Sequence, residues 1–244
     1  MKKSIKEIRR AARLQESKYE KHSKVGALFK EFILGGQDGL VNVLGVILGI
    51  AIATNSVKLV IVAGLAAAFA ESFSMAAVAY TSAKAEEDFY YSQEKKENFE
   101  INNIPKIETQ EVYDIYYKKG FRGKLLNDIV NHVVSNKKTW LGIMMKEELG
   151  LTKEFIHPIK SAIVVGLATM IGSFIPLITF FFMPIKTAIY ASLMLSAITL
   201  FVTGVLEARI NAMNWFKKGI ELMFIGMGAA GIGFLVGMLL GISV

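Results

Sequence analysis

The stretch EFILGGQDGLVNVLGVILGI, residues 31–50, decides the fold class of this chain. From Phe32 to Thr54 the sequence stays apolar long enough to cross a lipid bilayer, which takes about 20 residues of helix. Asp38 lies inside this run, where a carboxylate costs roughly 2.5–3.5 kcal/mol on membrane-insertion scales. An acid kept at that cost indicates that the segment does more than anchor the protein.

The rest of the chain extends this pattern. Of its 244 residues 53% are hydrophobic, and its mean hydropathy is +0.43. The absence of cysteine excludes disulfides, zinc–thiolate sites and cysteine nucleophiles. We predict an all-α membrane protein with five transmembrane helices, the first two within residues 31–82 and the last three within residues 161–244. The predicted spans are Phe32–Thr54, Leu59–Ser82, Ser161–Met183, Thr187–Leu206 and Leu222–Val244.

Lys and Arg predict the orientation of these spans. Of the 28 basic residues, 26 lie in the N-terminal arm 1–30, the polar insert 83–160 and the loop 207–221. Only Lys58 and Lys186 fall on the other side. By the positive-inside rule the arm and the insert face the cytoplasm and the C-terminus faces outward. The net charge of +7 is therefore a topology signal and indicates no nucleic-acid partner.

The loops and the insert also carry local signals. The short turn after Thr54 predicts a tight antiparallel pair of helices, and the loop 207–221 is expected to lie along the membrane surface with Trp215 as its anchor. The second span has no stop signal before Pro105, so its helix is expected to continue into the insert. Further insert helices are expected over about 108–119, over about 124–134, and from about 139 to Gly150.

Asp38 and Glu71 are the two ionisable residues inside the predicted spans. Asn42 and Met75 each follow one of them by four residues and so share its helix face. Carboxylate and amide oxygens with a thioether suit a borderline ion such as Fe²⁺ or Mn²⁺. The segment GQDG predicts either a local unwinding or close helix packing, and the sequence leaves both open.

The insert holds paired glutamates on both sides of Pro105. An E-x-x-E pair lies on one helix face and can hold iron or manganese, although a single pair is more often a solvated surface. Two pairs around a proline favour metal binding. The candidate ligands of the insert are Glu97, Glu100, Glu108, Glu111, Met144, Met145 and Glu148.

The sequence resembles the vacuolar iron transporter family from about Lys30 to Gly241. The resemblance rests on GGQDGLVNVLGVILG, AESFSMAAVAYTSAKAEED, ENFEINNIPKIETQEVYDIYYKKG, WLGIMMKEELGL and GVLEARI. It implies a homodimer in a lipid bilayer whose subunit interface moves Fe²⁺, and often other divalent ions, out of the cytoplasm in exchange for protons. It also implies that Asp38 and Met75 line the path and that the insert glutamates and methionines bind metal.

Several alternatives stay open at this point. An exporter of Mn²⁺ or of many divalent metals fits the same ligands, because carboxylate-rich sites discriminate poorly. A membrane-anchored protein that binds or stores iron would explain the insert but leave Asp38 and Glu71 unexplained, and a partner-recruiting membrane protein would explain neither. The three histidines lack metal-ligand spacing and no phosphate-binding loop occurs. We therefore expect no enzyme and no prosthetic group, and we expect a multi-pass protein of a prokaryotic plasma membrane.

Overall fold

The computed structural model describes residues 5–152, 157–210 and 213–241. These ranges are helical and contain no strand. The chain divides into two compact units: the first combines Met1–Thr81 with Pro158–Val244, and the second is Ser82–His157.

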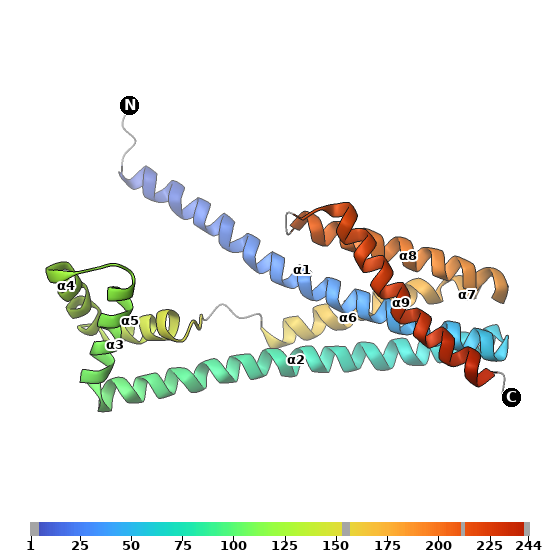
Figure 1. The fold of residues 1–244 in the computed structure, drawn as a ribbon, viewed down its shortest axis with the longest axis horizontal. Helices are drawn as coiled ribbons and strands as arrows, with labels where there is room; N and C mark the ends of the chain where they lie inside the picture. The colour runs from blue at the N-terminus through green and yellow to red at the C-terminus, as the bar shows by residue number, and fades with distance from the viewer. Residues whose placement is uncertain (1–4, 153–156, 211–212, 242–244) are drawn as a thin grey trace. The chain divides into compact units, whose positions relative to one another are not determined.

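The first unit contains helices long and apolar enough to cross a membrane, five of them in the described ranges, as predicted. Figure 1 labels them, with α7 as a short continuation of α6. Their bounds are α1 Ile5–Thr54, α2 Val57–Asn103, α6 Pro158–Leu177, α7 Thr179–Phe182, α8 Ile185–Ile210 and α9 Trp215–Gly241. Only the first part of α2, to Thr81, belongs to this unit.

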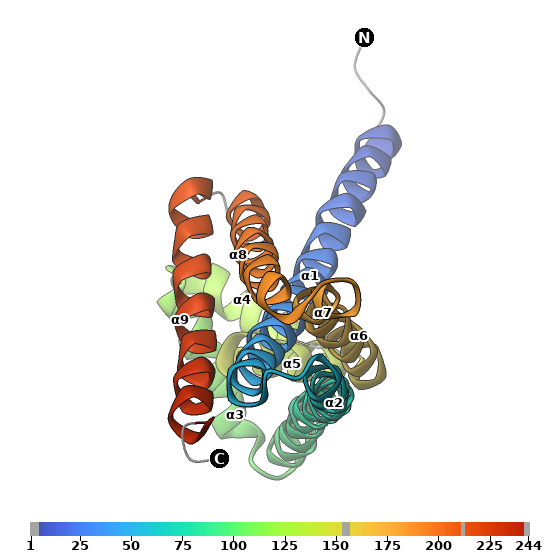
Figure 2. The ribbon, with the colours of Figure 1, turned by 90° about the vertical axis from the view of Figure 1, so that its right-hand side faces the viewer.

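The neighbours of α1 differ from the prediction. We expected the first two spans to form a tight antiparallel pair, but α1 packs most extensively on α6 and α9, and it also contacts α8 (Figure 2). Side chains of α2 reach α1 through one apolar cluster that includes Ile47 and Val60. The prediction of a surface loop over residues 207–221 is also wrong, because α8 continues to Ile210 and α9 already begins at Trp215.

Glycines allow the close approach of α1 to its neighbours. A Cβ atom on Gly35 would lie 2.7 Å from the carbonyl oxygen of Val165 on α6, and one on Gly233 of α9 would lie 2.8 Å from the backbone of Gly45. Small residues let helix backbones meet at this distance. Because α1 is an unbroken α-helix through GQDG, the alternative of a local unwinding is wrong and close packing is the role of these glycines.

Pro176 lies inside α6, which ends one residue later. The Pro176 carbonyl accepts hydrogen bonds from the hydroxyls of Ser192 at 2.9 Å and Thr179 at 3.2 Å. Both hydroxyl-bearing residues are buried. Such side chains satisfy backbone groups that a broken helix leaves open within an apolar environment.

The second unit contains the rest of α2 and the short helices α3 Pro105–Lys118, α4 Gly123–Val134 and α5 Lys137–Ile143. A π-helical turn, η1 Met144–Glu148, follows α5 directly. The expected helices of the insert agree with these bounds to within a few residues, and α2 continues without a break to the residue before Ile104, as predicted. Gly150 has a φ of +65°, which favours glycine, and lies just beyond η1.

A small apolar core holds the second unit together. It contains Ile101 from α2, Val112 from α3, Val130 from α4 and Trp140 from α5, together with Met144. The side chain of Asn136 caps α5 by accepting hydrogen bonds from the backbone amides of residues 138 and 139. This unit therefore has a core of its own on which the insert glutamates are positioned.

Candidate functional site

The acidic residues of the first two spans meet through Asn42. The Asn42 amide nitrogen donates to Asp38 Oδ1 at 3.3 Å on the same helix, and it also donates to Glu71 Oε1 on α2. The sequence could place Asp38 and Asn42 on one face of α1, but it could not show that this face meets Glu71. The structure thus brings two carboxylates and one amide together inside the membrane-spanning unit.

This group of Asp38, Asn42 and Glu71, the intramembrane acid cluster, is open at the side of the first unit. Asn42 is exposed, and the two acids are only half-buried. Met75 lies one turn after Glu71 on α2 and is half-buried as well. Carboxylates that face lipid are costly, so an open acid cluster in a spanning helix needs an ion, a proton or a further surface to cover it.

Glu31 is an acidic residue that the sequence reasoning did not single out. It lies seven residues before Asp38, two helical turns along the same face of α1. Its Oε1 accepts a hydrogen bond of 2.7 Å from Ser161 on α6, while its Oε2 is buried without a hydrogen-bond partner among the described residues. The seven-residue spacing to Asp38 was the signal that could have revealed it.

Five insert glutamates form a second group, the glutamate cluster of the second unit. Its members come from three elements and are Glu97 and Glu100 on α2, Glu108 and Glu111 on α3, and Glu148 on η1. Each lies close enough to at least two of the others for their charges to interact. The break at Ile104 brings the pair on α3 back toward the pair on α2, as the proline predicted.

Burial and mutual repulsion change the acidity of this cluster. Glu97 and Glu108 are each only 3% exposed. Burial raises the pKa of Glu97 to about 7, and repulsion from Glu148 and Glu100 adds to the effect. Burial likewise raises the pKa of Glu108 to about 7, with Glu111 as the strongest repelling neighbour. The pKa of Glu148 is also raised, again first by burial.

The cluster is not a closed metal site in this conformation. Within the described ranges, no three His, Cys, Asp or Glu side chains are arranged to hold one metal ion. Glu108 Oε2 is buried and lacks a hydrogen-bond partner among the described residues, so it is available as a ligand. Met144 packs in the apolar core, and Met145 is buried at 2% exposure. A π-helical turn such as η1 often marks a functional site.

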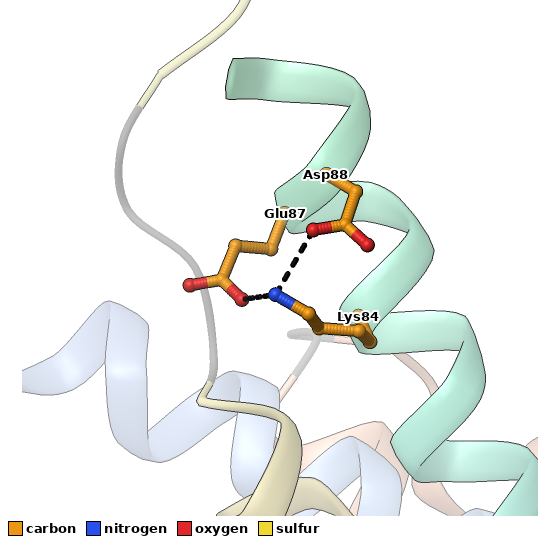
Figure 3. Close-up of polar contacts among 3 residues, drawn as sticks. All are labelled: Lys84, Glu87 and Asp88. Carbon is orange, nitrogen blue, oxygen red and sulfur yellow. Dashed lines mark hydrogen bonds and ion pairs between the residues drawn. The ribbon is translucent and has the colours of Figure 1, made fainter. Parts of the chain in front are cut away.

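Lysines pair with the cluster member Glu100, which lies 3.7 Å from Lys96 Nζ, and with acids of the second unit outside the cluster. Lys84 Nζ lies 2.8 Å from Glu87 and 2.9 Å from Asp88 on the outside of α2 (Figure 3). Glu147, next to a cluster member, pairs with Lys119, which lowers its pKa. Exposed pairs of this kind contribute little to stability. The acids outside the cluster fit an ordinary solvated surface and so differ physically from the buried Glu97 and Glu108.

Comparison with known proteins identifies related sequences. Residues 29–238 match the VIT family. The chain is 34% identical to "Vacuolar iron transporter 1" of Tulipa gesneriana over 215 residues, which cover 87% of each chain. It is 32% identical to "Vacuolar iron transporter 1" of Arabidopsis thaliana over 88% of this chain and 87% of that one. A "Vacuolar iron transporter" of Plasmodium falciparum is 28% identical over 91% and 85%, respectively.

Proposed function

Because this chain belongs to the VIT family, whose members are transporters and not enzymes, we propose that it carries Fe²⁺ out of the cytoplasm in exchange for protons. It is an integral membrane protein, and five helices in its described ranges are long and apolar enough to cross a membrane. Its relatives named as vacuolar iron transporters support a divalent metal, iron above all, as the substrate.

The observation that carries this proposal is the intramembrane acid cluster. Asp38 and Glu71 lie in apolar helices and share one amide donor, Asn42. Two carboxylates and an amide oxygen suit a divalent cation, and Met75 one turn away adds a softer ligand that favours Fe²⁺ over Mg²⁺. When the cation leaves, protons can take its place on the carboxylates, because two bare charges in hydrocarbon are costly. Alternate neutralisation by metal and proton couples the two fluxes.

A second copy of the chain is the proposed cover of this cluster. Asn42 is exposed at the side of the first unit. Val78, two helical turns after Glu71 on the same face of α2, is 55% exposed. Polar groups of spanning helices face a protein interior or a water-filled cavity and not lipid. A homodimer that joins these surfaces would enclose the acids in a path between the subunits.

The glutamate cluster of the second unit is the proposed cytoplasmic collector of the metal. Its five carboxylates supply oxygen ligands. Glu108 Oε2, which is buried and has no hydrogen-bond partner among the described residues, is available to bind a metal ion. A small movement of these carboxylates toward a bound cation would offset the mutual repulsion that helps to raise the pKa of Glu97 and Glu108, because the cation neutralises their charges. Met144 and Met145 are proposed to add thioether ligands after a side-chain rearrangement, since both are buried now.

Proteoliposome flux tests the proposal. Vesicles with an acidic interior and the cytoplasmic face outward should take up Fe²⁺ and lose internal acidity at the same time. Asp38→Asn keeps the size of the side chain but removes its charge, and it is expected to abolish uptake. Asp128→Asn makes the same chemical change at an exposed position of α4 and should leave uptake intact.

The outcomes separate the alternatives. Unchanged Fe²⁺ flux in Asp38→Asn would refute the role of the intramembrane acid cluster. Fe²⁺ uptake without a rise in the internal pH would reject proton antiport but would still show that the protein transports iron. No flux in the unmodified protein, with metal still bound, would favour the membrane-anchored iron-binding protein. Mn²⁺ that competes equally with Fe²⁺ would favour a broad divalent exporter.

A further inference from the structure

A crevice in the first unit combines charged groups at its opening with apolar walls. It has a volume of about 530 Å³ and lies between the part of α1 that includes Lys30 and Ile33 and the facing ends of α8 and α9. Its charged lining residues are Lys30, Glu207 and Lys218. Glu207 belongs to the GVLEARI stretch, which the proposed transport mechanism does not use. The lining carries two positive charges and one negative charge.

A second, smaller cavity adjoins this crevice. It measures about 110 Å³ and shares Phe29, Ile33 and Gln37 with the larger one. Its walls are almost wholly apolar, and its two threonines direct their hydroxyls to backbone carbonyls on α8, at 2.8 Å each. The charged residues Lys30, Glu207 and Lys218 therefore line only the larger cavity, and the adjoining smaller one is apolar.

Two carboxylates hold Lys218 at the opening of the crevice. Its ammonium lies 3.8 Å from Glu207 and 3.2 Å from Glu221, and its side chain is only 17% exposed. A lysine ammonium carries three donors, and only Glu221 accepts a hydrogen bond from it, so donors remain for a ligand. Lys30 lines the same opening from α1 and is exposed. A phosphate group here would meet the ammonium groups of Lys30 and Lys218, the second of which is also paired with Glu207 and Glu221.

The opening lies at the depth where lipid headgroups are expected. The apolar run of α1 begins directly after Lys30 and Glu31. Trp215 and Phe216, in the first turn of α9, are 54% and 53% exposed. Aromatic residues of this kind gather at the boundary between hydrocarbon and water. Basic pockets between spanning helices at this depth bind anionic lipid headgroups.

We propose that this crevice binds an anionic phospholipid. The phosphate lies between Lys30 and Lys218, and one acyl chain extends past Ile33 into the smaller cavity. Glu207 is a positioning residue that holds Lys218 toward the phosphate. The ligand is a lipid and not a free phosphate ester, because only an acyl chain uses the apolar end of the space.

Native mass spectrometry of the full chain in detergent tests the site. The delipidated protein is mixed with phosphatidylglycerol or with phosphatidylcholine that has the same acyl chains. Phosphatidylglycerol should be retained preferentially, and Lys30→Gln should reduce its retention about fivefold, the effect of one lysine at an anionic headgroup. Lys186→Gln, at an exposed lysine in the first turn of α8, is the matched control and should retain the lipid.

A second variant tests the apolar end without changing charge. Ile33→Trp should fill the space shared by the two cavities and lower lipid retention, whereas Val62→Trp, at a 57% exposed position of α2, should not. Equal retention of the two lipids, or equal losses in Lys30→Gln and Lys186→Gln, would overturn the proposal. Competition by glycerol 3-phosphate as strong as that by phosphatidylglycerol would also overturn it, in favour of a free phosphate ester. These measurements do not depend on metal transport.

Discussion

Lowering the pH from 8 to 6 is expected to weaken metal binding at the glutamate cluster about a hundredfold. A carboxylate must lose its proton to bind a metal ion, so protons and metal compete. With a pKa of about 7 for Glu97 and about 7 for Glu108, each group is about one-tenth protonated at pH 8 and about nine-tenths protonated at pH 6. Competition at each group therefore reduces the apparent affinity about tenfold. Glutamates of ordinary pKa would produce almost no change over this range.

Isothermal titration calorimetry of the full chain in detergent measures this effect. The protein carries Asp38→Asn and Glu71→Gln, which remove metal binding at the intramembrane acid cluster. Glu108→Gln removes one titrating group and should reduce the pH effect to about tenfold, although the two groups are coupled and titrate as a set. Glu147→Gln is the control, because Glu147 is paired with Lys119 outside the cluster. Binding that is equally strong at pH 6 and pH 8 would refute the reasoning, as would an equal change in both variants.

The same shifts predict how the metal-free second unit responds to pH. At any pH between the ordinary pKa of a glutamate and about 7, Glu97 and Glu108 bind more protons in the folded state than in the unfolded state. Stability is thus highest below the ordinary value and falls as the pH rises toward 7. Fluorescence of Trp140 in a Trp215→Phe background reports on this unit, because Trp140 lies in its core. A melting temperature that rises from pH 5 to pH 8 would contradict the assignment.

Two further predictions concern packing and capping. In thermal unfolding of the full chain in detergent, Gly35→Val should destabilise the first unit by about 1–3 kcal/mol, because its Cβ would lie 2.7 Å from the Val165 carbonyl oxygen. Gly228→Val, on α9 of the same unit, has open space around the added side chain and should leave the stability unchanged. Asn136→Ala removes the cap of α5 and should lower the stability of the second unit by about 1 kcal/mol in chemical denaturation, and an unchanged midpoint would show that the cap is dispensable.

Local features were predictable from the sequence because they depend on neighbours along the chain. Long apolar runs predicted the spanning helices, and the absence of a stop signal predicted that α2 continues far beyond Ser82. Pro105 begins a new helix, as its ring requires. The prediction that residues 207–221 form a loop along the membrane surface was wrong, because α8 extends to Ile210 and α9 begins at Trp215.

The sequence by itself determined which residues were candidates for function. These are two acids within apolar runs, where a charge is costly, and paired glutamates on both sides of a proline. Only the tertiary structure decided that Asn42 joins Asp38 to Glu71, that Glu31 is bound to Ser161, and that the glutamate cluster is buried enough to change its pKa. The physical reason is that hydropathy and helix periodicity depend on local order, whereas helix pairing depends on how whole surfaces fit. Glycines at the contacts with α6 and α9 set that fit, and the sequence alone does not pair them.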